Sequence, residues 1–168
     1  MKVLSRFGLG INLGYKTYNG IGPVFIWHPS PIFDFETGLG YSAYNGAKFG
    51  LGTKIYPFKK GNKVLPFIGI HYSVTTGSRI KTEVVDTRPE NYRTYSNQYV
   101  IGTVGFWVKG EQIQHQFALG YCGILTYPTL VPDNEKQANN HSAEIKRGLA
   151  SGISATYTIY LNLNKLDD

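Results

Sequence analysis

The sequence has very little cysteine and no long apolar run, and both absences narrow the class of protein. Cys122 is the only cysteine in 168 residues, so neither an internal disulfide nor a cysteine-based metal site can form. No run of roughly 18 apolar residues occurs, which excludes a transmembrane helix. Residues 1–6 also lack the apolar core and cleavage site of a secretory signal. If the chain is exported, we expect its leader to have been removed.

The bulk composition resembles that of a soluble protein but does not exclude a membrane barrel. Hydrophobic residues make up 42% of the chain, and the mean hydropathy is −0.21. The strands of a membrane barrel alternate lipid-facing and lumen-facing residues, so their apolar signal cancels on averaging. The net charge of +6 suits an anionic partner surface. Because the basic residues form no concentrated stripe, nucleic acid is not an expected partner.

Alternation with a period of two recurs along the chain, whereas helical periodicity is nearly absent. The clearest case is residues 152–163, where one face is almost entirely apolar. With a rise of roughly 3.3 Å per residue and a tilt near 40°, that face covers about 25 Å of membrane height. Its members are Ile153, Ala155, Tyr157, Ile159, Leu161 and Leu163.

Eight segments of this kind predict a single domain over residues 1–168. It is an all-β, closed, antiparallel up-and-down barrel that spans a bacterial outer membrane. Short and longer connections alternate along the chain, so the short turns and both termini are expected on the periplasmic side. The strands are expected at 3–15, 20–28, 33–42, 47–56, 64–75, 95–108, 113–122 and 152–163. The short turns are expected at 28–31, 57–63 and 109–112, and the longer loops at 15–20, 43–47, 76–93 and 126–143.

Aromatic residues cluster at both ends of the predicted strands, as in the two girdles of a membrane barrel. The predicted girdle at the long-loop end contains Tyr15, Tyr18, Tyr41, Tyr44, Tyr72, Tyr95, Tyr121 and Tyr127. The predicted girdle at the short-turn end contains Trp27, Phe33, Tyr56, Phe58, Phe67, Phe106 and Trp107.

The predicted lumen face carries charges that must be paired, because an unpaired buried ion is very costly. A five-residue loop 43–47 would place Glu36 across from Lys54, and a three-residue loop would place Asp34 there. Lumen glycines would leave space for long side chains such as Gln114, Gln116 and Tyr160. We therefore expect a polar, plugged interior and not a channel. The lumen charge network comprises Arg6, Asp34, Glu36, Lys48 and Lys54, and the glycines are Gly8, Gly10, Gly38, Gly40, Gly50 and Gly52.

Repeated glycine-rich phrases and the final strand carry a family resemblance. The phrases run from Phe7 to Tyr15 and from Phe49 to Tyr56, and residues 152–163 are similar to the C-terminal signal of barrel insertion. The chain resembles small eight-stranded outer-membrane barrels, the OmpA-transmembrane and OmpX group. It is most similar to the outer-membrane β-barrel domains common in Bacteroidota. The resemblance implies lipid and lipopolysaccharide as surroundings, other outer-membrane proteins as candidate partners, and a structural, adhesive or complex-subunit role.

Parts of the sequence are compatible with two other functions. His71-Tyr72-Ser73 resembles the His-x-Ser element of PagL-type lipid A deacylases, in which an acidic residue, here Glu83 or Asp86, completes the site. The two residues fall on the predicted lumen face, however, so the sequence favours a non-enzymatic protein. A soluble lipocalin-like carrier would need an apolar cavity, which the charged lumen face opposes.

The remaining candidate contacts lie in the loop 76–93. Its basic residues could meet the phosphates of an anionic outer leaflet. The acids Glu83, Asp86 and Glu90 dilute this basic character. The basic residues are Arg79, Lys81, Arg88 and Arg93. No metal or other cofactor is expected, because the histidines have no ligand spacing; they are His28, His71, His115 and His141.

Overall fold

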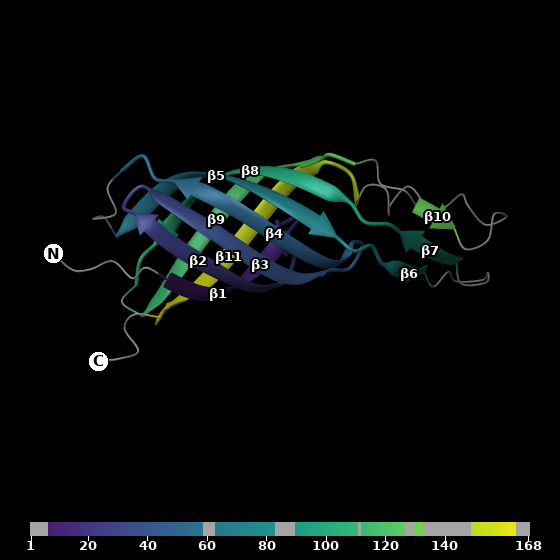
Figure 1. The fold of residues 1–168 in the computed structure, drawn as a ribbon, viewed down its shortest axis with the longest axis horizontal. Coiled ribbons are helices and arrows are strands. Elements are labelled where there is room, and N and C mark those ends of the chain that lie inside the picture. The colour runs from purple at the N-terminus through teal and green to yellow at the C-terminus, as the bar shows by residue number, and fades with distance from the viewer. Residues whose placement is uncertain are drawn as a thin grey trace.

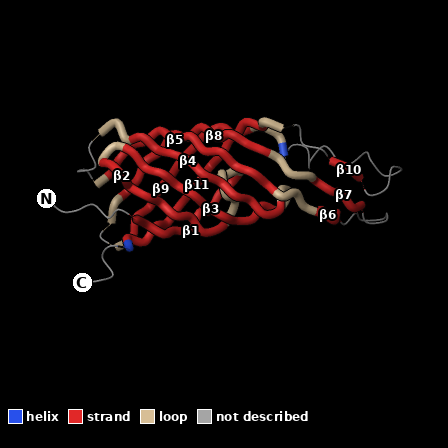
Figure 2. Tube along the Cα trace, in the orientation of Figure 1, coloured by secondary structure: helices blue, strands red, loops and turns tan. Residues whose placement is uncertain are grey.

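The computed structural model is built almost entirely of β-strands, as the red segments in Figure 2 show. It describes residues 7–58, 63–82, 90–110, 112–126, 130–132 and 149–163. In this part of the chain, no helix is both long enough and apolar enough to cross a membrane.

Eight strands form a closed barrel in which every neighbouring pair is antiparallel (Figure 1). The barrel closes between the first strand and the last, where Gly8 pairs with Asn162. This confirms the predicted fold class. In order of sequence the barrel strands are β1 (Phe7–Tyr15), β2 (Gly22–Ser30), β3 (Phe33–Ser42), β4 (Gly46–Ile55), β5 (Val64–Thr75), β8 (Gln98–Val108), β9 (Ile113–Ile124) and β11 (Gly152–Asn162).

A second, three-stranded sheet extends beyond one end of the barrel (Figure 1). It comprises β6 (Arg79–Thr82), β7 (Glu90–Thr94) and β10 (Leu130–Pro132), in the spatial order β10-β7-β6. The start of β1 and the end of β11 lie at the opposite end of the barrel. Apart from Thr94, these segments fall in the predicted loops 76–93 and 126–143, so the small sheet was not predicted from the sequence.

One proline of β2 lies where backbone pairing is interrupted. Pro29 falls where the register between β2 and β3 shifts, between Trp27 and Ser30. Because proline has no N–H to donate, it is tolerated at such a bulge. Strand β2 therefore runs on to Ser30, and the turn expected at 28–31 shrinks to residues 31–32.

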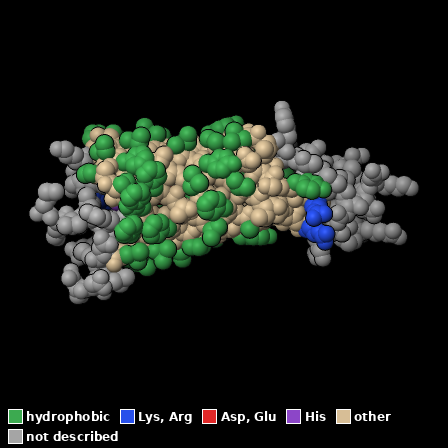
Figure 3. Space-filling view, in the orientation of Figure 1, with side chains coloured by type: hydrophobic (Ala, Val, Ile, Leu, Met, Phe, Trp, Pro, Cys, Tyr) green, Lys and Arg blue, Asp and Glu red, His purple; other side chains and the backbone are tan. Residues whose placement is uncertain are grey.

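The outer face of the barrel is apolar on all eight strands, and Figure 3 shows the apolar side chains over much of one side. Exposed examples from four of the strands are Ile11, Leu51, Ile68 and Leu119, each with at least 48% of its surface accessible. The inner face carries the polar side chains, and Asn12, Asp34, Lys54 and Ser73 are almost completely buried. The distribution is thus the reverse of that in a soluble barrel.

The aromatic girdles predicted from the sequence are only partly correct. Tyr18, Tyr56, Phe67 and Trp107 lie inside the barrel, with at most 4% of each exposed, so placing them in a girdle was wrong. Position near a strand end does not determine the face, and these residues have inward parity or lie in a connection. Other members are exposed as expected; they are Tyr15, Tyr41, Tyr44, Tyr95 and Tyr121 at one end, and Trp27, Phe58 and Phe106 at the other. Tyr127 lies outside the described residues.

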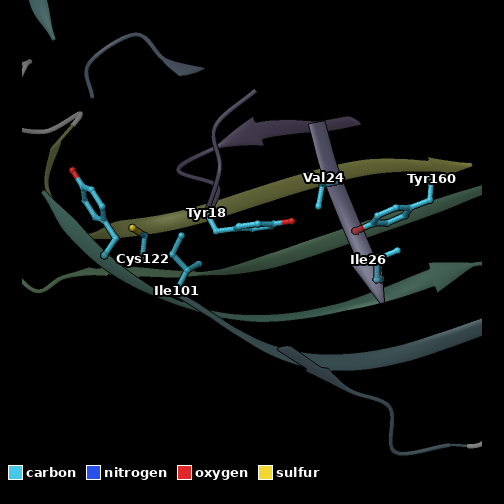
Figure 4. Packing of buried hydrophobic residues seen from close by; sticks show 7 residues of the cluster. Tyr18, Val24, Ile26, Ile101, Cys122 and Tyr160 are labelled. Carbon is cyan, nitrogen blue, oxygen red and sulfur yellow. The ribbon is translucent and has the colours of Figure 1, made fainter. Parts of the chain in front are cut away.

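Two apolar clusters share the interior with the polar groups. One contains Tyr56, Leu65, Phe67, Trp107 and Ala118, at the short-turn end. The other includes Tyr18, Val24, Ile26, Ile101, Cys122 and Tyr160 (Figure 4), together with Tyr99. The interior is therefore mixed, and not uniformly polar as we expected.

Candidate functional site in the barrel interior

The connection between β1 and β2 folds back into the barrel and fills part of it. Residues 17–20 are all buried, and Tyr18 points into the interior from this connection (Figure 4). Lys16 and Gly20 adopt positive φ angles of 52° and 69°, which allow the chain to turn inward. We call residues 16–21 the in-turned loop. The sequence predicted a loop at 15–20 but not its inward course.

Lumen glycines make room for the in-turned loop. A Cβ atom on Gly50 would lie 2.6 Å from the carbonyl oxygen of Tyr18, and one on Gly38 would lie 2.6 Å from Asn19 Nδ2. The sequence predicted that lumen glycines make room for Tyr160, and this holds for Gly10 on β1. A Cβ on Gly10 would lie 2.7 Å from the Tyr160 ring. Gly50 on β4 thus accommodates the backbone of the in-turned loop and Gly38 on β3 accommodates the Asn19 side chain, whereas the sequence predicted that lumen glycines make room for long side chains from the opposite wall.

Glu36 lies at the centre of a buried ionic network. Its carboxylate is paired with Lys54 Nζ and accepts a hydrogen bond of 2.5 Å from the Tyr160 hydroxyl. The register places Asp34 directly opposite Lys54, as a three-residue connection requires, yet the side chain of Lys54 reaches Glu36. His71 Nδ1 lies 4.0 Å from the other carboxylate oxygen of Glu36.

Asp34 has a different partner at the short-turn end. His28 Nδ1 lies 2.6 Å from Asp34 Oδ1, and the His28 ring stacks on Trp107 with a centroid separation of 5.0 Å. The lumen position of His28 was not predicted, because Pro29 and Pro31 indicated a turn in this region.

The remaining members of the predicted lumen network lie apart from this cluster. Lys48 is buried at the opposite end of the interior, near the in-turned loop, and donates a hydrogen bond of 2.6 Å to the carbonyl oxygen of Thr17. Arg6 lies outside the described residues. The structure thus brings Asp34, Glu36 and Lys54 into one region and leaves Lys48 separate.

His71 and Ser73 both face the interior, with at most 3% of each exposed. The His71 ring stacks on Tyr18 at 4.6 Å, and its Nε2 lies 3.3 Å from Thr103 Oγ1. Ser73 Oγ has no hydrogen-bond partner among the described residues. The two side chains therefore do not form a nucleophile–base pair. Glu83 and Asp86 lie outside the described residues.

Metal-ligating residues are dispersed. His28, His71 and His115 lie on β2, β5 and β9, and His141 is outside the described part. Within the described ranges, no group of three or more His, Cys, Asp or Glu side chains could hold a metal ion.

The basic residues predicted as surface contacts lie on or near the small sheet. Arg79 on β6 and Arg93 on β7 are exposed and directly opposite each other in the register. Figure 3 shows basic side chains at this end of the barrel. Lys81 also belongs to β6, whereas Arg88 lies outside the described residues.

Comparison with solved structures identifies the fold. The N-terminal β-barrel domain of OprF from Pseudomonas aeruginosa superposes with a TM-score of 0.58, covering 94% of this chain and 97% of that one at 9% identity. CarO from Acinetobacter baumannii is also similar, with a TM-score of 0.46 and 10% identity over 92% of this chain and 96% of its own. No family model and no curated protein sequence matches the chain. The predicted resemblance to small outer-membrane barrels is confirmed for the fold, while the closer likeness to Bacteroidota domains stays a prediction.

Proposed function

We propose that this protein is a non-enzymatic barrel of the bacterial outer membrane that holds the small sheet at the cell surface. There the sheet serves as a contact surface, in an adhesive role or as a subunit of a larger assembly. The observation that carries the proposal is the apolar outer face of a closed barrel whose charged residues are buried inside.

Lipid is the solvent that suits this surface. A barrel closed between β1 and β11 leaves no strand edge unpaired, which is what a bilayer core requires of any β-structure. Exposed apolar side chains on every strand would be costly in water but are favourable in hydrocarbon. Exposed aromatic rings at both ends, such as Tyr121 and Phe106, match the two membrane interfaces.

The opposed arginines of the small sheet support contact with lipopolysaccharide. Like charges directly opposite each other in a sheet are destabilising, and an anion between them relieves the repulsion. Arg79 and Arg93 meet this description, and both are exposed. Guanidinium groups bind phosphate in a bidentate way, so the phosphates of lipopolysaccharide suit them as partners.

The interior favours neither alternative function. A lipocalin-like carrier needs an apolar cavity, but Glu36, Lys54 and His71 occupy the lumen. A lipid A deacylase needs its nucleophile at the lipid-facing surface, but Ser73 is fully buried.

Cysteine labelling of intact cells tests both the membrane location and the orientation. In a Cys122→Ala background, one variant carries Ser96→Cys beside the small sheet and the other Lys63→Cys at the short-turn end; both positions are exposed. With a leader attached, we expect a membrane-impermeant maleimide to label Ser96→Cys in intact Gram-negative cells. Lys63→Cys should react only after the outer membrane is permeabilised. If Lys63→Cys reacted in intact cells and Ser96→Cys did not, the orientation would be wrong. If neither variant were found in the outer-membrane fraction with a cysteine that reacts, the location would be wrong.

Lipopolysaccharide contact needs a separate measurement. We expect lipopolysaccharide to raise the urea midpoint of the wild-type barrel in vesicles, because a ligand that binds only the folded state stabilises it. The double variant Arg79→Gln/Arg93→Gln should lose most of this increase, whereas Lys63→Gln at the other end should keep it. An equal increase in all three proteins would contradict the arginine contact.

A further inference from the structure

A cavity opens at the end of the barrel that carries the small sheet. Its volume is about 430 Å³, within the usual range for small-molecule sites. Its walls come from the in-turned loop, the connection between β3 and β4, and the inner faces of β4, β8 and β9. Tyr41 and Tyr44, which are 57% and 40% exposed, line it as well, so it is accessible from outside the barrel.

Lys48 supplies a buried positive charge at this cavity. Its side chain is almost fully buried, with 4% exposed. Its ammonium group donates to the Thr17 carbonyl oxygen and lies 4.8 Å from the centre of the Tyr99 ring. Among the described residues, no carboxylate lies within ion-pair distance of it, in contrast to Lys54, which is paired with Glu36. A buried cation without a counter-ion is costly, and an ammonium group has three N–H donors, of which Thr17 takes one.

The other lining residues also select for negative charge. Lys16 brings a second ammonium group, which donates to the Ala150 carbonyl oxygen at 2.7 Å. Among the described residues that line the cavity there is no aspartate or glutamate. Tyr41, Tyr44 and Tyr99 provide ring faces against which a planar or sugar ring can pack.

We propose that this cavity binds a small organic anion whose carboxylate or phosphate group meets Lys48 and whose ring packs against the tyrosines. The anion supplies the counter-charge that no carboxylate of the described residues supplies to Lys48. The same chemistry can come from a free solute or from the headgroup of an anionic lipid at the rim. The inference does not rest on the proposed surface role, because none of the described residues that line the cavity belongs to the small sheet.

The test is an NMR titration of the full chain in nanodiscs of zwitterionic phosphatidylcholine. The probes are benzoate and phenyl phosphate, with benzylammonium as a cation of similar size. We expect both anions to shift the backbone amides of Asn45, Tyr99 and Cys122 in a saturable way. Benzylammonium should leave them unchanged. Nanodiscs containing phosphatidylglycerol, without added probe, reveal whether a lipid headgroup produces the same shifts.

Matched variants assign the effect to Lys48. We expect Lys48→Met to weaken benzoate binding at least tenfold, and Lys48→Arg to retain it. Lys63→Met, at the far end of the barrel, should bind as the wild type does. Shifts from the lipid headgroup alone would support the site and identify its source. Equal shifts from benzylammonium and benzoate, no shift with any anion, or unchanged binding by Lys48→Met would overturn the proposal. If Lys48→Met does not fold, the comparison of anion and cation on the wild type still decides.

Discussion

Breaking the buried pair between Glu36 and Lys54 should destabilise the barrel strongly. Glu36→Gln keeps the size of the side chain and an acceptor for the Tyr160 hydroxyl, but it leaves Lys54 without the carboxylate it pairs with. Both side chains are at most 1% exposed, so water does not compensate for the lost partner. Removing one member of a buried pair typically costs about 3–5 kcal/mol, and we expect Glu36→Gln to cost about that much.

The reverse substitution should cost less. Lys54→Met leaves Glu36 charged, but its carboxylate keeps the hydrogen bond from the Tyr160 hydroxyl. The Met side chain also packs well against Phe67, over whose ring Lys54 now lies at 4.9 Å. The double variant Glu36→Gln/Lys54→Met has no unpaired charge, so we expect its stability to lie within about 1 kcal/mol of the wild type.

The assay is urea unfolding in phospholipid vesicles, followed by the fluorescence of the two tryptophans, with the four proteins forming a double-mutant cycle. Lys63→Met, on the exposed turn before β5, is the control and should change the free energy of unfolding by less than about 0.5 kcal/mol. Additive effects, with the double variant as unstable as the sum of the single ones, would refute the reasoning.

Two further predictions test the packing of the in-turned loop and the lipid-facing surface. Gly50→Ala should cost about 1–3 kcal/mol, because the new Cβ meets the backbone of Tyr18; Gly102→Ala, whose Cβ meets nothing within 4 Å, should be nearly neutral, and equal urea midpoints would contradict the loop placement. Leu119→Arg, in the middle of β9, should cost about 2–4 kcal/mol in vesicles, and Tyr121→Arg, nearer the rim, about 0–1 kcal/mol. Equal costs in the same urea titration would contradict the proposed depth of these residues.

The strands could be predicted from the sequence because lipid and lumen impose opposite polarity on alternate residues. In β11 this alternation is nearly uninterrupted, and the structure places the strand where the pattern does. The small sheet gave no such signal, because neither face of Arg79-Ile80-Lys81-Thr82 is consistently apolar. A strand outside the bilayer does not have lipid on one face and lumen on the other, so its residues need not alternate in polarity.

The interior was harder to predict, because a long side chain there can pair with a residue that is not directly opposite it in the strand register. The sequence left open whether Asp34 or Glu36 lies opposite Lys54. In the structure Asp34 is opposite Lys54 in the strand register, but the ion pair of Lys54 is with Glu36. The inward course of residues 16–21 depends on space left by glycines on other strands. This space depends on how β3, β4 and the loop lie relative to one another, so it could not be predicted from the sequence.

The central claim is that this barrel folds in lipid, and refolding from urea with and without phospholipid vesicles tests it most directly. Circular dichroism gives the β-content, and electrophoresis of unheated and heated samples gives the compactness. We predict a β-rich species that forms only with vesicles and whose mobility changes on heating. A β-rich monomer that forms in plain buffer would contradict the account, since the apolar outer face would then be stable in water.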